Sequence, residues 1–180
     1  MRRSFFALAL IPLAALAAEP RKLVVEGEVD APPAEVWRLF TTVEGVTSWM
    51  VPLAEVDLRV GGHMRTNYDP KGKVGDPKTI VNRILSYEPE RMLSLQNVEA
   101  PEGFPHAAAT RDTWSVIYFD PIDEGKRTRV RVVGLGWGEG PEADAAWAFF
   151  EQGNAWTVKR LQERIKAGKP LSWDRVPGAH

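Results

Sequence analysis

Cysteine is absent from the 180 residues, and histidine occurs only three times. Without thiols the chain has no disulfide, no cysteine nucleophile and no thiolate ligand for a metal. The formal charge of −1 gives no electrostatic reason to expect nucleic acid or an anionic membrane as a partner. Paired-histidine metal motifs and the nucleophile elbow of serine hydrolases are also missing, so we expect no metal site and no cofactor.

The first 18 residues have the composition of a secretory signal. Residues 1–3 are basic, residues 4–14 form a short apolar run, and residues 15–17 read Ala-Leu-Ala. These are the three regions of a signal peptide, in order. The alternative is a membrane anchor, but the run is short for the ~30 Å of a bilayer core and contains Pro12. We predict cleavage after Ala17 or Ala18, a periplasmic or secreted protein, and no stable membrane anchor.

The rest of the chain shows strand and helix periodicities in a simple order. Residues 54–60 alternate apolar and charged side chains, as in a half-buried strand. The last helix has Pro141 at its start and Gly168 just past its end, the usual asymmetry of helix termini. The expected strands cover 23–29, 54–60, 63–68, 79–87, 92–98, 112–119 and 128–135, and the expected helices 34–41, 43–49 and 142–166.

Short links between most strands predict antiparallel pairing. Strands gathered in one run before a long helix predict an α+β domain, in which a curved antiparallel sheet wraps around the C-terminal helix. Two short helices follow the first strand. We place this domain at residues 19–168 and expect a loosely ordered tail at 169–180.

Several segments carry a family resemblance. Residues 29–40, VDAPPAEVWRLF, resemble the opening signature of the START-like, SRPBCC or Bet v 1-type superfamily. Three further features occur in the order found in this superfamily: Trp49, the glycine turn at 60–64, and residues 149–156. Residues 149–156 resemble the start of the final helix in the branch of Hsp90 ATPase activators and polyketide cyclases. The resemblance spans residues 23–166 and implies a helix-grip fold. It implies no single function, because the superfamily includes carriers, receptors, cyclases, oxygenase subunits and co-chaperones.

A ligand pocket between sheet and helix is the site that the residues favour. Trp147, Phe150 and Asn154 share the helix face of the core residues Val158 and Leu161. Ligand pockets are mostly aromatic and apolar with few polar groups, although plain helix-on-sheet packing gives the same pattern. The predicted ligand-binding residues are Trp49, Met64, Trp114, Trp137, Trp147, Phe150 and Asn154.

Three functions remain open from the sequence. The first is an exported protein that binds a small apolar or amphipathic molecule. The second is a cyclase- or hydrolase-type enzyme with His106, Tyr118 or Arg65 as polar groups, although an exposed loop histidine is the more common explanation of His106. The third, implied by the resemblance, is a protein-interaction module like the Hsp90 activators. Phe149 and Trp156 lie on the opposite helix face and suggest a homodimer or a loop contact.

A charged ladder is also predicted. Arg127, Arg129 and Arg131 share one face of a strand, and we expect them to pair across the sheet with Asp112.

Overall fold

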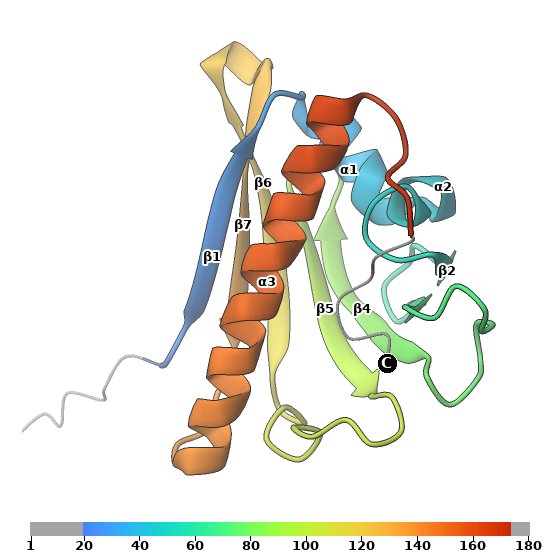
Figure 1. Ribbon diagram of the computed structural model, residues 1–180. Coiled ribbons are helices and arrows are strands. Elements are labelled where there is room, and N and C mark those ends of the chain that lie inside the picture. The colour runs from blue at the N-terminus through green and yellow to red at the C-terminus, as the bar shows by residue number, and fades with distance from the viewer. Residues whose placement is uncertain (1–19, 174–180) are drawn as a thin grey trace, which may run out of the picture.

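Seven strands form one antiparallel sheet in the order β1-β7-β6-β5-β4-β3-β2, and the long helix α3 lies across its inner face (Figure 1). The computed structural model describes residues 20–173, so the predicted signal segment and residues 174–180 lie outside the described residues. The strands are β1 (Leu23–Val29), β2 (Leu53–Val56), β3 (His63–Asn67), β4 (Ile80–Glu88), β5 (Met92–Glu99), β6 (Trp114–Ile122) and β7 (Arg127–Leu135). The helices are α1 (Pro33–Thr41), α2 (Val43–Thr47), the short 3-10 turn η1 (Asp123–Gly125) and α3 (Pro141–Ala167).

The predicted α+β helix-grip fold is confirmed. Pro33 begins α1, where its missing N–H costs no hydrogen bond, and Gly168 ends α3 in the left-handed conformation that glycine adopts readily. Within residues 20–173, no helix combines the length and apolar character needed to span a bilayer.

The core lies between α1, α3 and the inner face of the sheet. Trp37 contacts Phe119 edge-on at 5.7 Å, and Phe40 contacts Trp49 at 5.0 Å. The Trp49 indole N–H donates to the Leu39 carbonyl at 3.0 Å, so even the most buried indole has its polar group satisfied. From α3, Val158 and Leu161 complete this core.

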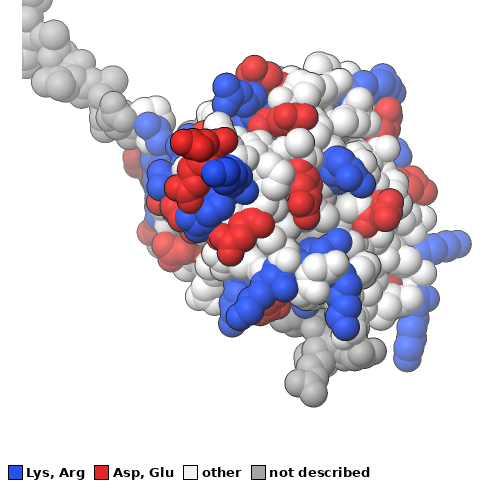
Figure 2. Space-filling view, turned by 90° about the horizontal axis from the view of Figure 1, so that it is seen from above, with Lys and Arg blue, Asp and Glu red and all other residues white. Residues whose placement is uncertain are grey.

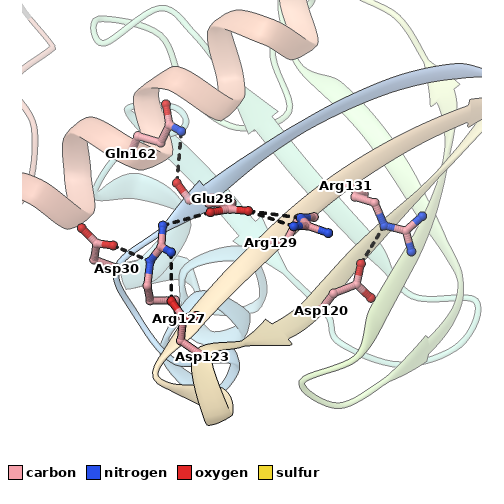
Figure 3. A network of polar contacts seen from close by, with 8 residues as sticks. All are labelled: Glu28, Asp30, Asp120, Asp123, Arg127, Arg129, Arg131 and Gln162. Carbon is pink, nitrogen blue, oxygen red and sulfur yellow. Dashed lines mark hydrogen bonds and ion pairs between the residues drawn. The ribbon is translucent and has the colours of Figure 1, made fainter.

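The outer face carries an ion-pair ladder that ties β1 to β7 (Figure 3). Arg127 contacts Glu28, Asp30 and Asp123 at 2.7–3.0 Å. Arg129 also binds Glu28, and these arginines hold the pKa of the Glu28 carboxyl below its usual range. Arg131 pairs with Asp120 at 2.6 Å. The ladder was predicted, but its partners are Glu28 and Asp120 instead of Asp112, because β1 and β6 flank β7.

Charges of both signs are also interspersed over the end of the molecule seen from above in Figure 2.

One predicted strand is shorter than expected. β2 ends at Val56, because the Arg59 and Gly62 amides donate to Asp57 and Arg59 carbonyls in a turn instead of a ladder. Val60 is therefore 65% exposed despite its apolar side chain.

The segment after α3 packs back on α2. The Leu171 amide donates to the Ser48 carbonyl at 2.9 Å, and the Trp173 indole donates to the Thr47 carbonyl at 3.2 Å. The Arg160 guanidinium lies between the Trp156 and Trp173 rings, 5.6 and 5.0 Å from their centroids. Residues 169–173, expected to be loose, thus have defined contacts up to the end of the described chain.

Candidate functional site

Six aromatic side chains from three segments meet at the start of α3, and we call them the aromatic cluster. Trp137 comes from the β7–α3 connection and lies 5.3 Å from Trp147. Phe149 lies 5.5 Å from Phe104 and 5.3 Å from His106, which both come from the β5–β6 connection. The sixth ring belongs to Phe150 and contacts Trp137, Phe104 and Phe149. Residues 45 positions apart in the sequence thus form one apolar assembly.

Two glycines place Trp137 in this cluster. Gly136 has a backbone φ of +76°, which residues with a side chain rarely adopt, and it turns the chain away from β7. A Cβ added at Gly134 would lie 3.0 Å from Trp137 Nε1 and 3.3 Å from its ring. The missing side chain at 134 therefore lets the indole pack onto the inner face of the sheet.

The aromatic cluster is more open to water than the aromatic residues of the core. Trp37, Phe40, Trp49 and Phe119 are at most 9% exposed. In the cluster, Phe149 is 46% exposed and the five other rings are half-buried. A contiguous apolar assembly that keeps part of its surface in water is a common feature of ligand and partner sites.

The inner face of the sheet also opens toward the cluster. Ile84, Leu93 and Phe119 are fully buried inner-face residues. Two or four residues further along their strands, the inner-face side chains are only half-buried, and Ser115 pairs with Gly134 beneath Trp137. We call these half-buried residues the open end of the inner face: Asn82, Leu95, Asn97 and Ser115.

The structure brings some predicted ligand residues together and separates others. Trp137, Trp147 and Phe150 are in the aromatic cluster. Asn154 lies one turn further along α3, half-buried, and makes no side-chain hydrogen bond within residues 20–173, whereas backbone bonding was the expected alternative. Trp49 and Met64 are closed inside the core.

The prediction that Trp114 faces the helix is wrong. Its strand neighbours Ser115 and Ile117 point to the inner face, so Trp114 lies on the outer face, 37% exposed.

Two of the three catalytic candidates also lie on the outer face. Arg65 faces away from α3 and pairs with Glu55 at 3.7 Å. Tyr118 lies under the Arg131 guanidinium, 4.7 Å from its ring centroid. Neither can serve a site on the inner face. His106 is the remaining candidate, and it lies in the aromatic cluster.

Sequence reasoning missed two aromatic residues near the inner face. Phe104 lies in a segment rich in proline and glycine, where no periodicity indicates a direction. Tyr68, just past β3, packs against the core, and burial raises the pKa of its phenol above the usual range.

Two cavities are described, and neither is the predicted cleft between α3 and the sheet. One, of about 460 Å³, lies among α1, α2, Arg164 and Pro170. The other, of about 320 Å³, lies between the β5–β6 and β7–α3 connections, beside the backbone of the cluster's two loops. No group of three acidic, histidine or cysteine side chains in the described part of the chain is arranged to hold a metal.

Comparison with solved structures supports the fold. The chain resembles protein MLL2253 from Mesorhizobium loti with a TM-score of 0.63 and 20% identity, over 82% of this chain and 98% of that one. It resembles the Aha1 dimer from Colwellia psychrerythraea equally, with 0.63 and 15% identity over 82% and 98%. DynU16, a putative protein in the dynemicin biosynthetic locus, gives 0.62 and 19% identity over 83% of this chain and 48% of that one.

A search of the curated proteins found no match to the chain. A family model does match, over residues 30–166, and its description is activator of Hsp90 ATPase homolog 1-like protein. The matched region begins just after β1 and ends within the last turn of α3, so it contains strands β2 to β7 and the aromatic cluster. The chain therefore belongs to the activator of Hsp90 ATPase homolog 1-like family, within the SRPBCC superfamily.

Proposed function

We propose that the protein binds a small apolar or amphipathic molecule outside the cytoplasm, at the aromatic cluster and the adjoining open end of the inner face. The observation that carries this proposal is the contrast in exposure between the two aromatic groups, since the core rings are closed and the cluster rings are not. Removing the cluster's exposed apolar area from water would favour binding by about 25 cal/mol per Å².

The position of the cluster supports binding as well. Its rings are held mainly by one another and by two connections between elements, and such connections can move more easily than strands. A ligand can therefore displace Phe104 or Phe149 without breaking the sheet.

The test is a titration of the full chain with N-phenyl-1-naphthylamine, an uncharged apolar dye whose emission rises in apolar sites. We expect binding, with energy transfer from tryptophan, and a loss of about tenfold or more in affinity in Phe150→Ala, because that ring lies at the centre of the cluster. Val60→Ala, at the exposed β2–β3 turn, is the matched control and should bind as the wild type does. An unchanged affinity in Phe150→Ala would refute the proposal.

Catalysis is the second candidate function, and the position of His106 favours it. The imidazole contacts the Phe104 and Phe149 rings, so it would border a bound molecule. The similarity of the fold to DynU16 is compatible with a role in small-molecule chemistry. Turnover found in a screen of esters and polyketide-like substrates, and lost in His106→Ala with unchanged dye affinity, would establish this function in place of simple binding.

A protein-interaction role is the third candidate, and the family name and the exposed Phe149 ring favour it. A homodimer built on this face would resemble the Aha1 protein in being dimeric. Sedimentation of wild type and Phe149→Lys decides the point: a dimer that dissociates in the variant supports an interface there.

A further inference from the structure

Trp137 carries the only buried side-chain nitrogen or oxygen without a hydrogen-bond partner in the described part of the chain. Buried polar groups are nearly always paired, so this indole N–H calls for an explanation. Its Nε1 lies over Gly134, whose strand neighbour on β6 is Ser115. The unpaired donor is therefore buried beside Ser115, one of the half-buried residues of the open end.

The inner face itself carries no charge. Charged side chains on neighbouring strands lie opposite one another on the outer face. These cross-strand pairs are Glu26 with Arg131, Glu28 with Arg129, Glu55 with Arg65, and His63 with Arg83. The inner positions between them are aliphatic, aromatic, hydroxyl or amide side chains.

Two cations beside α3 already have partners. Arg21 pairs with Asp144 at 2.5 Å and lies over the Trp147 ring at 4.1 Å. Arg160 donates to the Trp49 carbonyl at 3.3 Å and lies between two indoles. Because the inner-face side chains are uncharged and these two cations are already paired, a carboxylate or phosphate on that face would be desolvated without a counter-ion from either of them, which is unfavourable.

Building on the function proposed above, we infer that the ligand is an uncharged molecule with a carbonyl or ether oxygen that accepts a hydrogen bond from the Trp137 indole. Its apolar part packs on Phe150 and Trp147, and its oxygen lies toward Ser115. The N–H donor would thus fix the orientation of a molecule that apolar burial alone would leave free to rotate.

Three naphthalene probes of similar size separate the contributions. 2-Acetylnaphthalene carries a carbonyl, 2-ethylnaphthalene replaces it with an apolar group, and 2-naphthoate adds a negative charge. Affinities are measured by dye displacement at pH 8, where an ordinary histidine is neutral. The affinity for acetylnaphthalene is divided by the affinity for ethylnaphthalene, in the wild type and in Trp137→Phe. Dividing the wild-type ratio by the variant ratio removes the difference in hydration free energy between the two probes. We expect a quotient of about tenfold, and naphthoate binding weaker than acetylnaphthalene binding.

A quotient near one in a folded Trp137→Phe protein would overturn the inference while the proposed binding function stands. Failure of all three probes, and of the dye, would overturn both. Trp114→Phe removes an outer-face indole and should leave the quotient at its wild-type value.

Nuclear magnetic resonance of the wild type gives a test that needs no folded variant. The Trp137 indole proton, assigned through its contacts to the Trp147 and Phe150 rings, should move downfield with acetylnaphthalene and not with ethylnaphthalene. A proton that stays upfield with both probes would instead show an N–H contact with an aromatic face, and would overturn the inference.

Discussion

At the scale of single residues, the absence of a side chain decides how closely α3 approaches the sheet. A Cβ added at Gly27 on β1 would lie 2.4 Å from a methyl carbon of Val158, well inside contact distance. Valine is stiff and cannot rotate its branched end away at low cost. Gly153, in contrast, lies within α3 and has nothing within 4 Å of an added Cβ. The two glycines have opposite roles although both lie in regular structure.

Alanine at these positions should therefore have opposite effects on the free energy of unfolding. Gly27→Ala should lower it by about 1–3 kcal/mol through overpacking against Val158. Gly153→Ala should raise it by about 0.5–1 kcal/mol, because alanine is the better helix former. Urea denaturation followed by far-UV circular dichroism measures both. A Gly27→Ala protein as stable as the wild type would show that α3 is not held against β1 as described.

At the scale of elements, the sequence predicted the positions of helices and strands, but it did not predict which side chains of β6 point to the inner face of the sheet. Residues 23–29 alternate clearly, and β1 has the predicted bounds. On β6, both sets of alternate positions are largely apolar, Trp114, Val116 and Tyr118 on one face and Ile117 and Phe119 on the other. Periodicity cannot distinguish two apolar faces, so the inward placement of Trp114 and Tyr118 was wrong.

The site was predictable only where helix periodicity applied. Trp147 and Phe150 follow from the i, i+3 spacing on α3, and Trp137 was selected for its aromatic ring. Phe104 and the unpaired indole of Trp137 depend on how two irregular connections fold, which neither propensity nor spacing determines.

The ion pairs of Glu28 between β1 and β7 should make the free energy of unfolding fall at acidic pH. Arg129 and Arg127 lower the pKa of Glu28 in the folded protein, so its contribution is present above the unfolded pKa and is lost as the pH falls through the folded pKa. Between pH 5 and 3, the wild type should lose more unfolding free energy than Glu28→Gln. Glu102→Gln, at an exposed loop residue without an ion pair in the described residues, is the control. Equal losses in wild type and Glu28→Gln would contradict the role given to this pair.

The segment after α3 should contribute to stability like a short element. Trp173→Ala removes the stack on Arg160 and the hydrogen bond to the Thr47 carbonyl, and should cost about 1–3 kcal/mol. Ser172→Ala, at the exposed neighbour, should change stability by no more than about 0.5 kcal/mol. Thermal and urea unfolding of the two variants measure the difference. If Trp173→Ala costs as little as Ser172→Ala, the contact of this segment with α2 does not contribute to stability.

At the scale of the whole molecule, the two faces of the sheet differ in charge and in role. The outer face holds charges in pairs, while the inner face holds the core and, at its open end, the uncharged surface where we place the ligand. Alternation of charged and uncharged residues produces this division on strands such as β1 and β7, so the ligand site requires no charged residue in the core.

Export is the last prediction, and it concerns the whole chain. Cleavage after Ala17 or Ala18 would leave Arg21, which binds Asp144 and covers the Trp147 ring, and all of β1 on the mature protein. Because the chain has no cysteine, its folding should not depend on the redox state of the compartment. We expect N-terminal sequencing of protein from its host to begin at Ala18 or Glu19, in the periplasm or medium. A variant lacking residues 2–18, made in the cytosol, should have the same unfolding free energy as the exported protein. An intact Met1 on soluble cytosolic protein from the host would refute export.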